Sequence, residues 1–227
     1  MVEPFTLEKP GSNTGWGVPF VHYSWEQSPG PLWLRAELKG FGGETKSGVD
    51  WIFTSVESVE DAVLAYVLNN VILSKGEGCM PGTLGVGVGG YTAEAAAAAK
   101  NAVFRDLGDI ARAASGDPFL RRLEERIYRC VNRLGLGPMG GGGDTTTMGV
   151  YLEKRGAHTA ALPVAVSQQC WASRAAEASI SPDGTAFLTP CVEADDAAAV
   201  NELLDGEMSA PAGAAAEIGR ASCRERV

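Results

Sequence analysis

Residues 79–108 read CMPGTLGVGVGGYTAEAAAAAKNAVFRDLG, and this stretch indicates the fold class. A short strand-like segment lies among the glycines of residues 79–90. Thr92 can then cap a strongly helical, alanine-rich run that ends at Gly108. Strands and helices that alternate along a chain are typical of mixed α/β proteins. We therefore expect an α/β fold in which mixed sheets are packed against helices.

Strand and helix periods recur on both sides of this stretch. Toward the amino terminus, alternation from Leu32 to Lys39 predicts a half-buried strand, and Ser58 with Asp61 predicts a capped helix that runs to about Leu73. Toward the carboxyl terminus, apolar residues at helical spacing predict an amphipathic helix over residues 117–134. Further strands are predicted over residues 147–154, 161–167 and 185–189, and a short helix near residues 195–204.

The composition excludes several classes of protein. The 227 residues carry a formal net charge of −9 and include no basic stripe, so nucleic acid is not an expected partner. Hydrophobic residues make up 45% and charged residues 21%, which is typical of a soluble globular protein. No apolar run reaches the roughly 18–20 residues that span a bilayer, so no membrane is expected as a partner. Because no basic segment followed by an apolar one opens the chain, we expect a cytoplasmic protein.

The cysteines, at positions 79, 130, 170, 191 and 223, are the main candidates for chemistry. An odd number at wide spacing favours reduced thiols or metal ligands over a disulfide framework. Cys79 precedes a glycine-rich stretch and Cys170 follows a predicted strand, so both side chains can point into a cleft. Because no zinc-type spacing occurs, buried free thiols remain the alternative. Cys130 lies within the amphipathic helix and is expected to be a packed core thiol.

His158 lies twelve residues before Cys170. A predicted strand separates the two, so they need not be close in space. From the residues alone, a structural histidine is the alternative to a catalytic one.

The spacing from Gly85 to Gly90 matches the G-x-G-x-x-G pattern of dinucleotide-binding proteins. That pattern also needs an acidic residue about 20 positions further on, at the end of the next strand. Asp106 and Asp109 instead end a predicted helix, so we expect no nucleotide site. The glycine-rich stretches can still bind an anion through backbone N–H groups, or simply form tight turns.

Several segments together resemble class I, iron–sulfur fumarate hydratases and the alpha chains of L-tartrate dehydratases. The longest runs from Gly135 and reads GLGPMGGGGDTTTMGVYLEKRGAHTAALPVAVSQQCWASR. The others are GSNTGWGVPFVHY (11–23), KGFGGETKS (39–47), CMPGTLGVGVGG (79–90) and AKNAVFR (99–105). The resemblance covers about residues 1–190 and implies the catalytic (alpha) domain type of these iron–sulfur hydro-lyases.

The resemblance also implies roles for particular residues. In this family three cysteines hold a [4Fe-4S] cluster, which assigns Cys79 and Cys170 as metal ligands and leaves Cys130 and Cys191 structural. The third ligand belongs to a Cys-Gln-Asp-Thr-Gly motif that the sequence does not contain. His158 matches the family's active-site histidine. The backbone of Gly42 and Gly43, and the charge of Lys46, are candidates for binding substrate.

The activity implied by the resemblance is reversible hydration of fumarate to L-malate through an open-site [4Fe-4S] cluster. The alternatives are an L-tartrate dehydratase alpha chain, whose substrate differs by one hydroxyl group, and a non-catalytic subunit-docking fragment. The implied partners are a small dicarboxylate, a beta-type subunit or C-terminal domain, and a second copy of the chain in a dimer.

Three segments are expected along the chain. Residues 1–190 are expected to be a partial catalytic domain, and residues 191–217 an end and linker rich in alanine and acidic residues. Residues 218–227, IGRASCRERV, resemble a translated sequencing adapter and are expected to be an artefact. Because the third cysteine and the C-terminal (beta) domain are missing from the sequence, the chain alone is expected to be inactive.

Overall fold

The computed structural model describes residues 5–9, 21–23, 25, 30–105, 117–184 and, for the backbone only, 186–189. The predicted helix near residues 195–204, Cys191, Cys223 and the predicted artefact lie outside these residues. The chain divides into two compact units, one formed by Met1–Leu34 with Ala178–Val227 and the other by Arg35–Glu177. The second unit contains the buried core and the candidate site residues.

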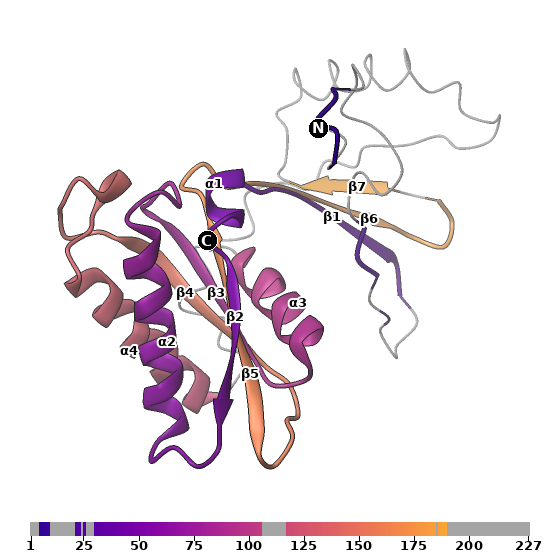
Figure 1. The fold of residues 1–227 in the computed structure, drawn as a ribbon. Coiled ribbons are helices and arrows are strands. Elements are labelled where there is room, and N and C mark those ends of the chain that lie inside the picture. Colours follow the sequence, from indigo (N-terminus) through magenta and orange to yellow (C-terminus); the bar gives the residue numbers. More distant parts are fainter. Residues whose placement is uncertain are drawn as a thin grey trace. The chain divides into compact units, whose positions relative to one another are not determined.

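A four-stranded mixed sheet is the centre of the second unit (Figure 1). Its strands, in spatial order, are β2 (Gly48–Phe53), β5 (Ala161–Gln169), β3 (Gly82–Val88) and β4 (Thr147–Lys154). β5 is antiparallel to both neighbours, whereas β3 and β4 are parallel. The mixed α/β class predicted from the sequence is therefore confirmed. The strand over residues 147–154 is confirmed at its predicted bounds, whereas β2 was not predicted.

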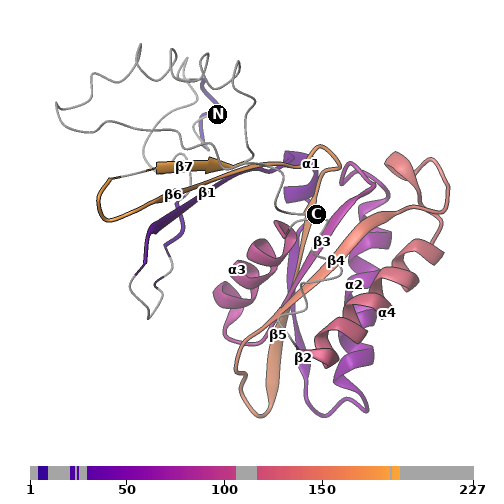
Figure 2. The ribbon, with the colours of Figure 1, turned by 180° about the vertical axis from the view of Figure 1, so that it is seen from behind.

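Helices cover both faces of this sheet (Figures 1 and 2). α2 (Val59–Ser74) and α4 (Pro118–Arg133) lie together on one face, and α3 (Thr92–Val103) lies on the other. The predicted capping pair of α2 is confirmed, because the Ser58 hydroxyl accepts the N–H of Asp61 at 3.2 Å. The predicted cap of α3 is wrong by one residue. Tyr91 occupies that position, and its N–H donates to the Glu94 carboxylate.

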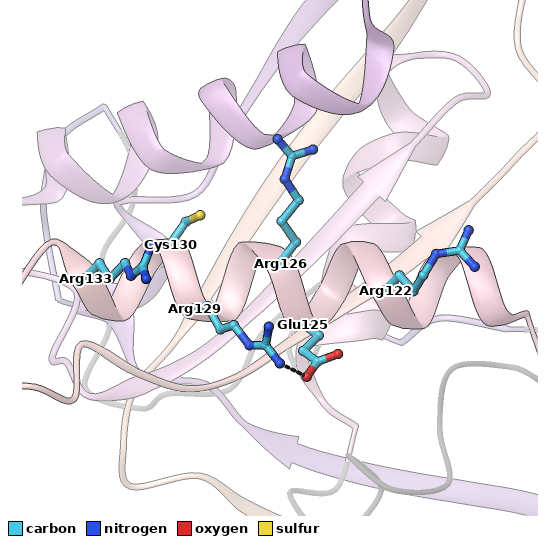
Figure 3. A pocket seen from close by; sticks show the side chains of 6 residues that line it. All are labelled: Arg122, Glu125, Arg126, Arg129, Cys130 and Arg133. Atoms are coloured by element: carbon cyan, nitrogen blue, oxygen red, sulfur yellow. Dashed lines mark hydrogen bonds and ion pairs between the residues drawn. The ribbon is translucent and has the colours of Figure 1, made fainter.

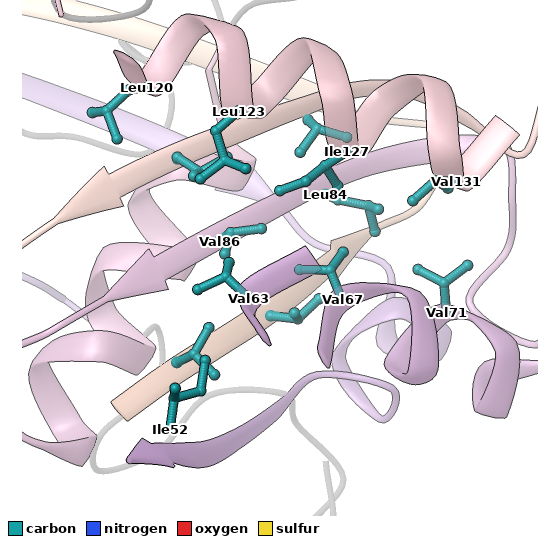
Figure 4. Packing of buried hydrophobic residues seen from close by; sticks show 14 of the residues in the cluster. Ile52, Val63, Val67, Val71, Leu84, Val86, Leu120, Leu123, Ile127 and Val131 are labelled. Atoms are coloured by element: carbon teal, nitrogen blue, oxygen red, sulfur yellow. The ribbon is translucent and has the colours of Figure 1, made fainter. Parts of the chain in front are cut away.

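The main core lies between the sheet and the α2–α4 pair (Figure 4). Apolar residues at helical spacing on α2 and α4 point toward alternate residues of the strands, as the amphipathic pattern of α4 predicts. The core includes Val63, Val67 and Val71 from α2, Leu120, Leu123, Ile127 and Val131 from α4, and Leu84 and Val86 from β3. This packing holds the ends of β3 and β5, which carry the candidate site.

Glycines of β3 allow α3 to lie directly against the other face of the sheet. A Cβ atom at Gly85 would lie 2.0 Å from the Ala99 carbonyl oxygen, and one at Gly87 would lie 2.0 Å from the Ala95 oxygen. Two glycines of the G-x-G-x-x-G pattern therefore belong to a strand and serve helix packing. The dinucleotide pattern arises from this contact, because only a residue without Cβ fits there.

A second sheet has the strand order β1 (Leu32–Leu38), β6 (Arg174–Ile180) and β7 (Ala186–Thr189). The strands predicted near Leu32–Lys39 and over residues 185–189 are confirmed as β1 and β7, whereas β6 was not predicted. The half-buried character predicted for β1 is wrong, because Leu32, Trp33 and Leu34 are all exposed. Alternation indicated the strand but not whether one of its faces is covered.

The described ranges contain no helix with the length and apolar character needed to cross a bilayer.

Candidate functional site

The structure brings Cys79 and Cys170 together at one edge of the main sheet. Cys79 lies shortly before β3, and Cys170 directly follows β5. Because the two strands are antiparallel neighbours, with Thr83 paired to Gln169, the start of β3 meets the end of β5. The Trp171 N–H donates to the Cys79 carbonyl oxygen at 3.4 Å, which fixes the two backbones side by side.

Both cysteines are free and half-buried. Burial raises the pKa of the Cys79 thiol, and the charge and hydrogen bond of the Cys170 thiol raise that pKa further. A second thiolate so close is unfavourable in the absence of a cation, and a bound metal ion would reverse that balance. Cys79 also adopts φ of +61°, a conformation that side-chain-bearing residues rarely take and that is often found at functional sites.

A glycine turn, defined here as residues 40–47 and including the short helix α1 (Phe41–Glu44), lies directly against both cysteines. A Cβ atom at Gly40 would lie 2.5 Å from Cys170 Cβ, and one at Gly42 would lie 3.0 Å from Cys79 Sγ. At Gly43 it would lie 2.4 Å from the Gln168 carbonyl oxygen. The structure thus places Gly42 beside the Cys79 thiol and Gly43 beside the backbone of Gln168, while their binding of substrate stays a prediction.

Lys39 fastens the glycine turn to the end of β5. Its ammonium group donates to the Gln168 carbonyl oxygen at 2.6 Å and lies 2.7 Å from the Glu44 carboxylate. Burial lowers the pKa of Lys39, an effect that Glu44 opposes. The sequence analysis predicted no site role for Lys39, although this residue begins the segment KGFGGETKS (39–47).

Lys46 lies at the other end of the turn and forms an ion pair with Glu77. The Lys46 ammonium group lowers the pKa of the Glu77 carboxyl through a hydrogen bond and through its charge. The Asn70 side chain also donates to the Lys46 carbonyl oxygen at 3.1 Å. The charge of Lys46 thus has a partner in this state, and its contact with substrate stays a prediction.

Gln168 provides a buried acceptor without a donor beside the site. Its Nε2 donates to Asn70 Oδ1 at 2.8 Å, whereas its Oε1 has no hydrogen-bond partner among the described residues. A Cβ atom at Gly78, the residue before Cys79, would lie 2.3 Å from that Oε1 atom. A buried acceptor left without a donor is unusual in a folded protein and can mark a place for water or ligand.

The structure does not bring His158 to the thiols. This residue lies between β4 and β5, is exposed, and accepts the Ala160 N–H at Nδ1. The nine residues of β5 separate it from Cys170, a distance of roughly 30 Å at about 3.3 Å per residue. The structure therefore places His158 away from the cysteine pair of its own chain. Its catalytic role stays a prediction.

The comparison with known proteins assigns the family. Residues 2–179 match the model of the family described as Fumarate hydratase (Fumerase). This chain belongs to the fumarate hydratase family.

Its relatives include fumarate hydratases and tartrate dehydratases. A Methanocaldococcus jannaschii protein provisionally named L(+)-tartrate dehydratase subunit alpha is 35% identical over 179 residues, covering 78% of this chain and 60% of the relative. A Geobacillus stearothermophilus protein provisionally named fumarate hydratase class I is 33% identical over 80% of this chain and 36% of the relative. The Escherichia coli K12 L(+)-tartrate dehydratase subunit alpha is 32% identical over 76% of this chain and 55% of the relative. The chain thus spans between about a third and three fifths of these relatives.

The cysteine pair of this fumarate hydratase family member fits part of a cluster site. Cys79 and Cys170 lie on neighbouring strand ends, Gly42 and Gly40 contact their side chains, and the buried Gln168 Oε1 atom lies beside Gly78 without a described hydrogen-bond partner. The described part of the chain gathers no group of three or more His, Cys, Asp or Glu side chains that could hold a metal ion. The assignment of Cys79 and Cys170 as two of the three thiolates that the resemblance implies therefore stays a prediction.

A separate cavity of about 380 Å³ lies on α4, where it is lined by Arg122, Glu125, Arg126, Arg129, Cys130 and Arg133 (Figure 3). Arg126 pairs with Glu60 and Asp61 of α2, and Arg129 pairs with Glu125. Cys130 is half-buried beside these arginines, so its prediction as a packed core thiol is wrong. The helix presents this position at the rim of its apolar stripe, one residue before the buried Val131.

Proposed function

We propose that this chain is the portion of an iron–sulfur hydro-lyase that supplies two thiolate ligands, Cys79 and Cys170, to a [4Fe-4S] cluster. The observation that carries the proposal is the convergence of these thiols against the glycine turn, in a chain of the fumarate hydratase family. The proposed reaction is reversible hydration of fumarate to L-malate. The cluster would supply a Lewis acid that polarises the departing hydroxyl group.

The residues around the pair would hold the site in shape. The backbone of Gly42 and Gly43 is proposed to approach substrate, since Gly42 lies against the Cys79 sulfur. Lys39 would keep that turn against β5 through its bonds to Gln168 and Glu44. A binding role for Lys46 requires release from Glu77. Because His158 lies roughly 30 Å from Cys170 within one chain, we propose that it contacts substrate at the cluster of the second copy in the dimer.

L-tartrate is the second candidate substrate, and a specific observation favours it. Relatives at 32% and 35% identity are named as alpha subunits of L(+)-tartrate dehydratase. These names also support a beta-type partner subunit for this chain. We propose a cytoplasmic enzyme that acts with that subunit or an equivalent domain, and a dimer as its assembly.

The first experiment tests the cluster ligands. The chain is reconstituted anaerobically with iron and sulfide, and iron per chain and visible absorbance are measured. Cys79→Ser and Cys170→Ser are expected to lose the iron, because each removes one of the converging thiolates, whereas Cys130→Ser should retain it. Iron retention in both site variants at the level of the unchanged protein would overturn the assignment.

The second experiment tests activity and substrate. The isolated chain is expected to be inactive, because its described residues bring only two thiolates together. Activity is then measured with fumarate and with L-tartrate after addition of a beta subunit from a relative. Full fumarate hydration by the isolated chain would contradict the expected inactivity. Iron binding without activity on either substrate would support the non-catalytic docking alternative.

A further inference from the structure

Cys79 and Cys170 can react with each other without any metal. We propose that hydrogen peroxide converts this pair into an intramolecular disulfide, a reversible modification that closes the site to iron. Disulfide formation requires only the thiol geometry, whereas its effect on iron rests on the function proposed above.

The geometry favours this pairing over any other in the described residues. The Trp171 N–H donates to the Cys79 carbonyl oxygen at 3.4 Å and so holds the two backbones together. Gly40 lies against the Cys170 side chain and Gly42 against the Cys79 sulfur, so one short segment contacts both cysteines. A disulfide needs Cα atoms within about 7 Å, and neighbouring strand ends can provide that approach.

The exposure of the cysteines and the surroundings of Cys130 also favour a disulfide between Cys79 and Cys170. Both cysteines are half-buried rather than enclosed, so a small oxidant can reach them. Cys130 is also half-buried, but it lies among the arginines of α4 and has no described thiol beside it. A cysteine without a neighbouring thiol can be oxidised, but it has no adjacent partner with which to form a bridge.

The reaction balances with peroxide as the oxidant. One thiolate attacks a peroxide oxygen, the O–O bond breaks, and a sulfenic acid and water form once a proton is taken up. The second thiolate attacks the sulfenic sulfur, the S–S bond forms, and hydroxide leaves as water after protonation. In sum, two thiols and one peroxide yield one disulfide and two waters, and the two electrons pass from sulfur to oxygen.

The test uses the full chain, free of iron and fully reduced, treated with hydrogen peroxide. Peptides are mapped by mass spectrometry without reduction. We expect the Cys79 peptide linked to the Cys170 peptide as the main product, with the link reversed by dithiothreitol. The same treatment in guanidinium chloride should remove this preference, because the folded contact selects the pair. Separate sulfinic acids at the two positions, or equal linkage to other cysteines in the folded chain, would overturn the proposal.

Cysteine variants test which residues form the link, and iron uptake tests its effect on the site. Cys130→Ser should form the same link between Cys79 and Cys170. In Cys170→Ser, the Cys79 peptide should show no main cross-link to another cysteine. The contrast between folded and denatured protein decides the question even if Cys170→Ser does not fold. Pre-oxidised protein should lose iron uptake and regain it after dithiothreitol. A reduced chain that takes no iron would count against the proposed function alone, and iron binding without a disulfide would count against the disulfide alone.

Discussion

Gly40 is the residue on which the placement of Cys170 depends most directly. Its backbone has φ of −64°, which alanine adopts without strain, so only the space around it matters. A Cβ atom would lie 2.5 Å from Cys170 Cβ, and neither atom can move without its backbone. We expect Gly40→Ala to cost about 1–3 kcal/mol of unfolding free energy, as overpacked positions do, and to slow disulfide formation. Urea unfolding and the peptide map measure the two effects.

Gly156→Ala is the matched control for this change. No heavy atom lies within 4 Å of a Cβ atom at Gly156, so its stability should stay close to that of the unchanged protein. Equal stability of Gly40→Ala and Gly156→Ala, with unchanged linkage of Cys79 to Cys170, would show that the turn does not position the thiol.

Only some of the other site residues could be predicted from the sequence. Cys79, Cys170 and the glycines were predicted as site residues because they lie in sequence segments that resemble a known family. Gln168 was not found, because nothing in its sequence neighbourhood shows that its Oε1 atom is buried without a donor. Lys39 gains its importance only from the carbonyl and carboxylate that the fold places around it.

At the scale of elements, the contact of α3 with β3 depends on missing side chains. A Cβ atom at Gly87 would lie 2.0 Å from the Ala95 carbonyl oxygen and 2.6 Å from the Ala99 nitrogen, both in the backbone of α3. We expect Gly87→Ala to destabilise the fold by about 3 kcal/mol, because the whole helix must move away from the strand. Guanidinium unfolding followed by circular dichroism measures this loss. A loss no larger than that of Gly156→Ala would contradict close packing of the helix.

Glu124 of α4 makes stability depend on pH through its contact with β4. Its carboxylate accepts the Leu152 N–H at 2.6 Å and lies 3.4 Å from Arg105, yet burial raises its pKa above the ordinary 4.5. The folded chain then holds the proton more tightly than the unfolded chain. This contribution is complete below pH 4.5 and is lost as pH rises through the raised pKa.

Glu124→Gln keeps an oxygen for the Leu152 N–H and removes the charge. We therefore expect the unchanged protein to lose stability relative to Glu124→Gln as pH rises from about 4.5 through the raised pKa. Urea unfolding of both proteins across that pH window tests the sign. A difference that moves in the opposite direction would mean that Arg105 outweighs burial.

At the scale of the whole molecule, a bridge between Cys79 and Cys170 would close a long loop of the chain. The two positions lie 91 residues apart in the sequence. Closing a loop of that length restricts the unfolded chain, and we expect the oxidised protein to gain about 2–4 kcal/mol of stability. Urea midpoints with and without dithiothreitol measure the gain, with Cys130→Ser as a control that should behave the same. A lower midpoint for the oxidised protein would show that the native site resists the bridge.

The three long helices α2, α3 and α4 and several strands could be predicted because their signals are local. Ser58 with Asp61 marks the start of α2, the apolar spacing from Phe119 to Leu134 marks α4, and alternation over residues 147–154 marks β4. β6 could not be predicted, because its alanine-rich segment has little of the β-branched and aromatic content that indicates a strand. Capping and periodicity depend on residues within about one or two turns, so the sequence by itself determined these elements and the family.

The tertiary structure alone decided which residues meet. The antiparallel pairing of β3 with β5 brings Cys79 to Cys170 across 91 residues, and the length of β5 carries His158 away although it lies only twelve residues from Cys170. Register between strands depends on burial across the whole sheet rather than on neighbouring residues. For that reason, neither the approach of Cys79 to Cys170 nor the buried Gln168 Oε1 atom without a described hydrogen-bond donor could be predicted before the sheet is assembled.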